Sequence, residues 1–259
     1  MMKKQVVWIG VATMGLGLAA EAAVVILPNG NRVEGSEVRA RPNGDIVLTT
    51  PQGQRTFPRG QYQRAEADKP ATYDRAGSLV SQGQFDQAIS LLKQIVSEYQ
   101  YLTWDNNARI ALARVYLSQK KPAEAVNVFE ELFEADPAYR NDDQVAWAYR
   151  SALVDAEQFD KLDQDLERVI AAGSREQAAR AQIMRGDAKM KRGLVEQAVM
   201  DYLRSAILFE SETSVHPEAL LKSAQGLEQL RDPRAKELYR KLVETYPQSP
   251  QAQQARGKL

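Results

Sequence analysis

Cysteine is absent from this sequence of 259 residues, and histidine occurs once, as His216. Without cysteine the chain can form no disulfide, no thiolate metal site and no cysteine nucleophile, and it lacks the lipid-modified cysteine that tethers bacterial lipoproteins. A single imidazole gives catalytic triads and histidine-rich metal sites little to build on. These shortages argue against most enzyme classes, and they predict a protein that holds no metal and no cofactor.

The sequence also lacks an excess of either charge, because it has 34 basic and 34 acidic residues. A neutral chain has no strong attraction for nucleic acid or an anionic membrane, so we expect neither as a partner. No G-x-S-x-G, H-E-x-x-H or glycine-rich phosphate loop occurs. Three acidic residues near His216 (Glu210, Glu212 and Glu218) match no known metal-site spacing, and we interpret them as structural or solvated. We therefore predict that the protein is not an enzyme.

The first 22 residues have the composition of an export signal. Lys3 and Lys4 precede an apolar run, Val6 to Leu18, which is shorter than the ~20 residues needed to cross a bilayer as a helix. Ala20 and Ala22 then offer small residues at the two positions that a signal peptidase reads. The alternative is an uncleaved membrane anchor. We favour a cleaved signal peptide over residues 1–22, no membrane span after cleavage, and a periplasmic or secreted protein.

Residues 23–66 are typical of a small β module. Three turn clusters rich in proline, asparagine and glycine separate short apolar or alternating segments, of which Ile46 to Thr50 is the clearest strand. We expect strands at 24–27, 32–41, 46–50 and 55–57, and a fifth at 62–64. This rhythm resembles a small SH3-like or Sm-like sheet. The six arginines of residues 24–64 have two possible roles. They could form a surface that contacts an anionic polymer or a protein, or they could be charges that keep the sheet edges from aggregating.

From residue 70 onward the hydrophobic period changes to that of amphipathic helices. In the stretch 235–246, one stripe is apolar and the opposite face is charged, and proline follows at position 247. Similar stretches recur upstream, each led by an aligned residue, at intervals of 37, 37, 36 and 37 residues. The aligned residues are Ala88, Ala125, Leu162, Ala198 and Ala235. Twelve residues before each stands Ala76, Ala113, Arg150, Gly186 and Ser223. Such regularity predicts a repeat protein.

This pattern of small residues, aromatic residues and a closing proline resembles the tetratricopeptide repeat. The resemblance covers residues 70–259 and implies a mainly α fold: an α-solenoid of about five helical hairpins, preceded by the β module. Small side chains at the crossing of each hairpin would let its two helices pack closely. The second repeat fits best, whereas the third has Arg150 and Leu162 where small residues belong, so we expect irregular packing there.

The resemblance also implies a partner-binding groove lined by the first helix of each hairpin. The groove residues that it predicts are Tyr73, Ile110, Arg114, Trp147, Ile183 and Asp187. The lysine and asparagine that one subclass uses to grip a terminal carboxylate are missing. Tyr73 and Trp147 would be the anchors for a bound peptide, unless these aromatics pack within the array. The aromatic segment 99–104 is expected to fill a junction between hairpins.

These features together predict an exported scaffold that binds a protein or peptide partner in the cell envelope. The repeat period resembles exported bacterial tetratricopeptide proteins, such as those of the Tol–Pal system and of outer-membrane protein assembly. An alternative is an envelope-polymer binder, in which the β module contacts peptidoglycan or another anionic surface and the repeats act as a spacer.

Overall fold

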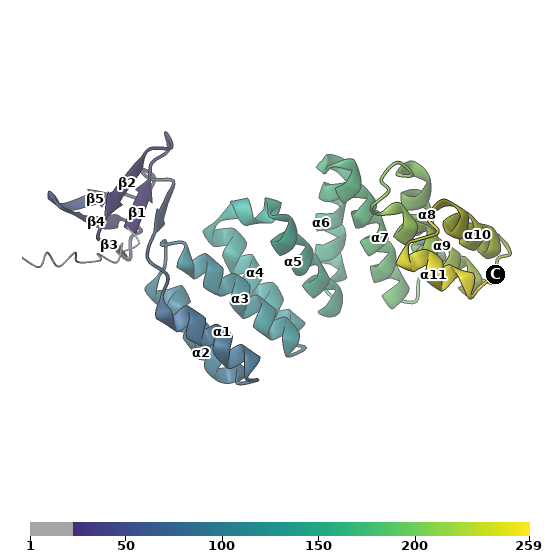
Figure 1. The fold of residues 1–259 in the computed structure, drawn as a ribbon, viewed down its shortest axis with the longest axis horizontal. Coiled ribbons are helices and arrows are strands. Elements are labelled where there is room, and N and C mark those ends of the chain that lie inside the picture. The colour runs from purple at the N-terminus through teal and green to yellow at the C-terminus, as the bar shows by residue number, and fades with distance from the viewer. Residues whose placement is uncertain (1–22) are drawn as a thin grey trace, which may run out of the picture. The chain divides into compact units, whose positions relative to one another are not determined.

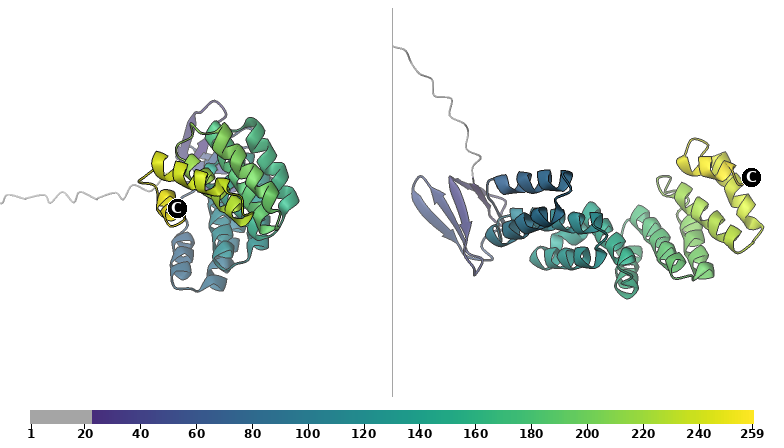
Figure 2. Two further views of the ribbon diagram at one scale, coloured as in Figure 1. Left: turned by 90° about the vertical axis from the view of Figure 1, so that its right-hand side faces the viewer. Right: turned by 90° about the horizontal axis from the view of Figure 1, so that it is seen from below.

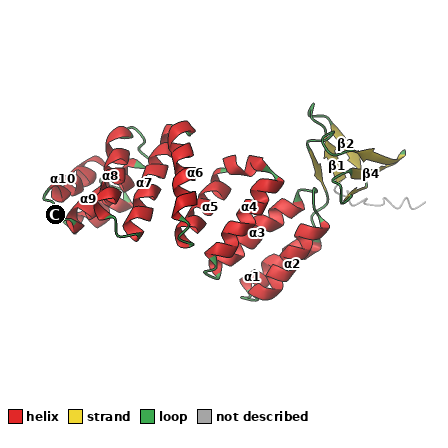
Figure 3. Cartoon of the chain, turned by 180° about the vertical axis from the view of Figure 1, so that it is seen from behind, coloured by secondary structure: helices red, strands yellow, loops and turns green. Residues whose placement is uncertain are grey.

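The computed structural model describes residues 23–259, so the predicted signal peptide lies outside the described residues. Strands come first and helices follow, as Figure 3 shows by colour. The chain divides into two compact units, with the division between Val115 and Tyr116, and we describe each unit by itself. No helix within residues 23–259 is long and apolar enough to cross a membrane.

The first unit begins with six short strands. They are β1 (Ala23–Ile26), β2 (Arg32–Gly35), β3 (Glu37–Ala40), β4 (Ile46–Thr50), β5 (Gly53–Phe57) and β6 (Arg64–Glu66). They form two antiparallel three-stranded sheets, in the orders β2-β1-β6 and β3-β4-β5 (Figure 1). The prediction of a small β module is confirmed, and its inner side chains form one core with Val25, Ile46, Leu48 and Phe57 at its centre.

Two details of the strands differ from the sequence prediction. The expected strand 32–41 is broken, because the backbone N–H of Ser36 donates to the carbonyl oxygen of Thr49 at 2.8 Å and moves the chain from one sheet to the other. Gly35 permits this approach, since a Cβ atom there would collide with the same carbonyl oxygen. The last strand is Arg64–Glu66 rather than 62–64, because Ala65 pairs with Val25.

The helices of the first unit are α1 (Ala71–Ser81), α2 (Phe85–Glu98) and the start of α3 (Trp104–Ser118). The aromatic segment 99–104 packs on the β module through Tyr99, Tyr101 and Leu102, which the sequence prediction missed. Its last residue, Trp104, meets Tyr73 of the first hairpin, so the expected junction between hairpins is filled in part. Leu102 is buried in the β core. Thr103 Oγ1 donates to the carbonyl of Ala65 at 2.9 Å, and the Trp104 indole donates to that of Ala67 at 2.8 Å. These contacts tie the β module to the segment that leads into α3.

The second unit consists of helices that each lie beside the next (Figures 1 and 2). They are α4 (Pro122–Ala135), the 3-10 turn η1 (Pro137–Asn141), α5 (Asp143–Asp155), α6 (Phe159–Ala172), α7 (Arg175–Lys191), α8 (Val195–Leu208), α9 (His216–Gln229), α10 (Arg234–Thr245) and α11 (Pro250–Arg256). In chain order, α1 to α10 of the described residues make five helix–turn–helix segments, each with a left-handed residue in its turn, and α11 follows the last. The predicted number of hairpins is therefore confirmed.

The repeat positions behave as the spacing predicts. All five aligned residues, Ala88, Ala125, Leu162, Ala198 and Ala235, are buried. At the positions twelve residues earlier, Gly186 shows the reason for small side chains, because an added Cβ would collide with the ring of Tyr202 on the partner helix α8. In the third repeat the same position holds Arg150, which is buried and donates from Nε to Asp165 at 2.6 Å. The expected irregularity is thus an ion pair at a helix crossing.

The turns inside the hairpins share one backbone geometry although their sequences differ. Gly83 and Gly193 have φ angles of 74° and 76°, a left-handed conformation that glycine adopts easily. Lys120, Glu157 and Arg231 adopt the same conformation in the other three hairpins, with φ between 55° and 57°. Only two of the five turns could therefore be recognised from glycine alone.

Candidate functional site

The six predicted groove residues lie on first helices of the hairpins, three in each unit. Tyr73 lies on α1, and Ile110 and Arg114 lie on α3. Tyr73 is half-buried, and its ring meets the ring of Trp104 edge-on, with centroids 5.1 Å apart. It therefore packs within the unit, the alternative interpretation of this aromatic. Ile110 is half-buried and Arg114 is exposed, so both keep surface that a partner can contact.

Trp147 on α5 has the most distinctive surroundings of the six. Two guanidinium groups lie over its ring, that of Arg150 at 4.6 Å and that of Arg180 at 4.2 Å from the centroid. Cations over an indole face are favourable, because the ring carries negative electrostatic potential there. The indole Nε1 is buried and has no hydrogen-bond partner among the described residues. An unsatisfied buried donor costs about 1–3 kcal/mol, so a ligand that accepts a hydrogen bond from the Trp147 N–H would recover that free energy.

Arg180 also links α7 to the start of α5. Its guanidinium lies 3.6 Å from Asp143, whose carboxylate also accepts from the Gln177 side chain at 2.9 Å. Both Arg180 and Asp143 are substantially exposed, so this ion pair contributes little to stability and can be rearranged at small cost. The indole of Trp147 is therefore covered on one side by a side chain that can move.

The two predicted residues of α7 are used inside the protein. Ile183 is buried in the hydrophobic core of α7–α11 and offers little surface to a partner. Asp187 accepts from the Tyr202 hydroxyl at 2.7 Å and from Lys222 at 2.6 Å. Burial, followed by the nearby Asp187 carboxylate, raises the pKa of Tyr202, which therefore stays a hydrogen-bond donor at neutral pH. Asp187 thus serves mainly to connect α7, α8 and α9.

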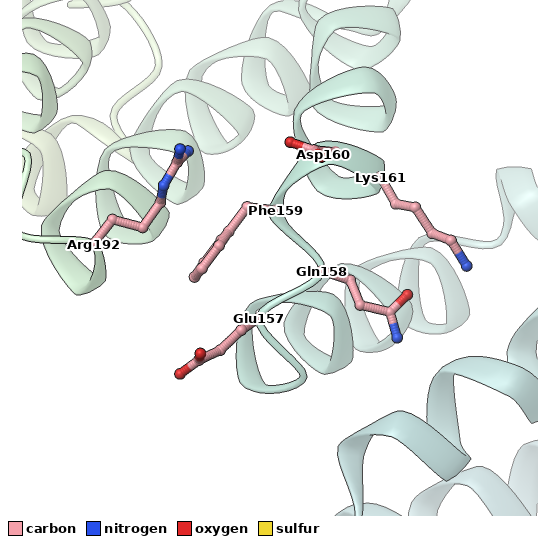
Figure 4. A pocket seen from close by; sticks show the side chains of 6 residues that line it. All are labelled: Glu157, Gln158, Phe159, Asp160, Lys161 and Arg192. Atoms are coloured by element: carbon pink, nitrogen blue, oxygen red, sulfur yellow. The ribbon is translucent and has the colours of Figure 1, made fainter.

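A pocket of about 340 Å³ lies between two hairpin turns of the second unit (Figure 4). Phe159, at the start of α6, points toward Arg192, whose guanidinium lies 5.2 Å from the ring centroid. Lys161 points away from that pair, and Glu157 lies in the turn that precedes α6. The lining carries both signs of charge around a single aromatic ring.

A second pocket, of about 440 Å³, was not recognised in the sequence. Residues of η1, α5, α6 and α7 line it: Arg140, Asn141, Asp143, Ala146, Arg150, Arg168, Val169, Ala172, Gly173 and Gln177. Three of these are arginines, and they come from three different segments of the chain. The departure of the third repeat from the small-residue pattern was the sequence signal that could have located it, because Arg150 is both that departure and part of the lining.

His216 has a structural role. Its ring is buried, with Nε2 3.0 Å from the carbonyl oxygen of Ala206 and Nδ1 2.8 Å from the Tyr246 hydroxyl. Both ring nitrogens are thus occupied by protein groups. Within residues 23–259, no group of three or more histidine, aspartate or glutamate side chains is arranged to hold a metal ion. The acidic residues near His216 therefore form no such site.

Most arginines of the β module have a partner within their own unit. Arg39 pairs with Glu37 at 2.6 Å, and Arg64 pairs with Glu66 at 2.6 Å. Two further arginines lie over aromatic rings, Arg55 over Phe57 and Arg59 over Tyr101. The positive charge of this module is accordingly distributed over local pairs.

Comparison with known proteins agrees with the repeat pattern. Family models described as tetratricopeptide repeat match residues 79–153 and residues 218–249. No curated protein matches the sequence. The chain therefore contains tetratricopeptide repeats.

Solved structures show the same fold. MamA (residues 41 to the end) from Desulfovibrio magneticus RS-1 is similar with a TM-score of 0.51 and 17% identity, over 69% of this chain and 95% of that chain. The apo form of RapI is similar with a TM-score of 0.55 and 13% identity, over 70% of this chain and 54% of that chain. At these identities the similarity establishes the fold, a tetratricopeptide-like α-solenoid with a small β region before it, and no particular activity.

Proposed function

We propose that this protein is an exported, non-enzymatic scaffold that binds a segment of another cell-envelope protein on the first helices of its repeats. The observation that carries the proposal is Trp147, whose ring is contacted by two guanidinium groups and whose buried N–H has no partner among the described residues. Tryptophan and arginine are the residues most enriched among strong contributors to protein interfaces. Displacement of the mobile Arg180 would open the ring to an apolar side chain of the partner, and a backbone carbonyl could then accept the indole N–H.

The binding proposal is tested by comparing proteins retained from an envelope extract by the wild-type chain, Trp147→Ala and Phe209→Ala. Phe209 is a matched control, because it is also partly buried under an arginine, Arg175 at 5.3 Å, but follows α8. We expect one set of proteins to be lost with Trp147→Ala and kept with Phe209→Ala, with both variants folded by circular dichroism. Identical retention by all three proteins would contradict the proposal.

Export is the part of the proposal that rests on residues 1–22 alone. Two lysines, a short apolar run and small residues at positions 20 and 22 support a cleaved signal. Amino-terminal sequencing of the protein from an envelope fraction is expected to start at Ala23. A start at Met1 or Met2 would indicate a retained segment. The resemblance to Tol–Pal and outer-membrane-assembly proteins stays a prediction, which identification of the retained partner would test.

The alternative function, binding of an anionic envelope polymer by the β module, has one residue in its favour. Arg41 is exposed and, unlike the other five arginines of the module, has neither a carboxylate nor an aromatic ring as a side-chain partner among the described residues. Co-sedimentation of the full chain with isolated peptidoglycan at low and high salt tests this function. It requires retention at low salt that Arg41→Gln reduces. The full chain is needed, because Leu102 belongs to the β core.

A further inference from the structure

The pocket of about 440 Å³ in the third repeat has an excess of positive charge. Asp165 is shared by two guanidinium groups, those of Arg150 at 2.6 Å and Arg168 at 3.3 Å. One carboxylate therefore balances only one of the two cations.

Arg140, from the 3-10 turn, adds a further positive charge. Its guanidinium lies over the ring of Phe133 at 4.5 Å, and it has no carboxylate partner within residues 23–259. Asp143, the one acidic residue of the lining, is already engaged by Gln177 and Arg180. Three arginines and Asp143 line the pocket, and Asp165 and Arg180 pair with members of that lining from outside it. Four cations thus meet two carboxylates, which leaves two positive charges unbalanced.

The pocket exists because the third repeat departs from the pattern. The other four repeats place Ala76, Ala113, Gly186 or Ser223 where this one places Arg150, and small residues are what let paired helices approach. The Arg150–Asp165 pair occupies the crossing of α5 and α6. Arg150 is also part of the pocket lining, so the pocket lies beside the crossing at which the other repeats have a small side chain.

The rest of the lining is suited to a peptide rather than a bare ion. Ala146, Val169 and Ala172 form an apolar wall, while Asn141 and Gln177 bring amide groups. A volume of about 440 Å³ lies within the usual range of roughly 300–1,000 Å³ for binding pockets. Arginine recognises carboxylates with two parallel hydrogen bonds, which is the geometry that adds specificity to charge.

We propose that this pocket binds a carboxylate group of a peptide, either an acidic side chain or a carboxyl terminus. Arg140 and Arg168 would supply the hydrogen bonds, and the apolar wall would hold the adjoining residue. The inference rests on the proposed scaffold function in naming the chemistry of a partner segment. Arg150 lies beside both sites, but the proposed donors, Arg140 and Arg168, are not the arginines that lie over the ring of Trp147. It also explains why the third repeat keeps an arginine at a position that packing would give to a small residue.

Three short peptides test the inference by isothermal titration with the full chain. The probes are acetyl-Gly-Glu-Glu-Gly-amide, acetyl-Gly-Gln-Gln-Gly with a free carboxyl terminus, and acetyl-Gly-Gln-Gln-Gly-amide, which has no carboxylate. We expect at least one carboxylate-bearing probe to bind at least about tenfold more tightly than the third, with the advantage falling at high salt. The probe that binds identifies the source of the carboxylate. Equal or undetectable binding of all three would overturn the inference.

Variants then assign the binding to this pocket. The double variant Arg140→Gln with Arg168→Gln and the single variant Ala172→Glu change exposed positions of the lining, so both are expected to fold. Each should weaken the binding at least about tenfold, the first by removing hydrogen bonds and the second by repulsion. Arg240→Gln is the matched control, an exposed arginine of α10 away from the pocket, and should bind like the wild type. Unchanged binding by both pocket variants would overturn the inference.

The two proposals fail separately. If a partner depends on Trp147 but no carboxylate probe binds, the carboxylate-binding inference is wrong and the scaffold function stands. If the probes bind through Arg140 and Arg168 but no partner depends on Trp147, the carboxylate-binding inference stands and the proposed function is wrong.

Discussion

The hydroxyl group of Tyr246 donates a hydrogen bond to Nδ1 of His216, with 2.8 Å between the two atoms. The direction follows from the other ring nitrogen. Nε2 lies 3.0 Å from the carbonyl oxygen of Ala206, which can only accept, so Nε2 carries the proton and Nδ1 is the acceptor. The buried ring thereby joins the start of α9 to α8 and to the residue that follows α10.

This arrangement predicts a dependence of stability on pH. Burial lowers the pKa of His216, and Lys241 acts in the same direction, while the Ala206 carbonyl and Glu210 oppose them. The pKa of His216 in the folded protein therefore lies below the ordinary 6.5. As the pH falls through 6.5, the unfolded chain binds a proton at His216 more readily than the folded protein does, so the unfolded state is favoured. We expect the free energy of unfolding to fall as the pH decreases from about 6.5.

Urea denaturation between pH 7.5 and 5.5, with His216→Gln as the comparison, checks this dependence. His216 is the only histidine of the chain, so the variant should lose most of the slope over that interval. If the wild type and the variant have the same slope, the assignment to His216 is wrong.

Gly186 is predicted to be intolerant of even one added methyl group. A Cβ atom there would collide with the Tyr202 ring, so Gly186→Ala should destabilise the protein by about 1–3 kcal/mol through overpacking, although alanine is the better helix former. Gly77→Ala is the matched control, because Gly77 also lies within a helix and has nothing within 4 Å of the added atom. It should stabilise by up to about 1 kcal/mol. Chemical denaturation of both variants measures the two changes in the free energy of unfolding. If both changes have the same sign, the packing argument is wrong.

Asp201 is expected to contribute to the loss of stability of the second unit at acidic pH. Burial opposes its charge, but hydrogen bonds from Arg185 and Lys189 outweigh the burial and lower the pKa of Asp201 below its ordinary value. A lowered pKa gives stability that is present above the unfolded pKa and is lost as the pH falls through the folded one. Asp201→Asn should cost about 1–3 kcal/mol at pH 7, because it removes the charge that the partly buried Arg185 and Lys189 bind and weakens their hydrogen bonds. Its acid unfolding should also show a shallower dependence on pH, and an unchanged acid transition would count against this role.

Ala125 tests the register of the repeats. It is fully buried on α4, so Ala125→Leu should overpack its surroundings and destabilise by about 1–3 kcal/mol. Ala123→Leu, on the exposed side of the first turn of the same helix, should change the stability by less than about 0.5 kcal/mol. Thermal melting that does not distinguish the two variants would show that the register is misassigned.

The candidate site could be predicted only in part. The repeat spacing located Trp147 on a first helix, but it gave no sign that Tyr73 packs on Trp104, since that contact joins residues far apart in the sequence. Asp187 looked available by position, yet Tyr202 and Lys222 from other helices take up its carboxylate. The arginine-lined pocket draws its side chains from η1, α5 and α6, so no single stretch of sequence contains it.

Strands followed by helices, five hairpins, and buried side chains at Ala88, Ala125, Ala198 and Ala235 could all be predicted from the residues alone. This was possible because hydrophobic period and small residues at a fixed interval act locally, within one hairpin at a time. Two features came to light in the folded chain: segment 99–104 packs on the β module, and Arg150 is neutralised by Asp165 rather than excluded from the core. Both outcomes depend on which distant groups come within hydrogen-bonding distance, and that is a property of the folded chain.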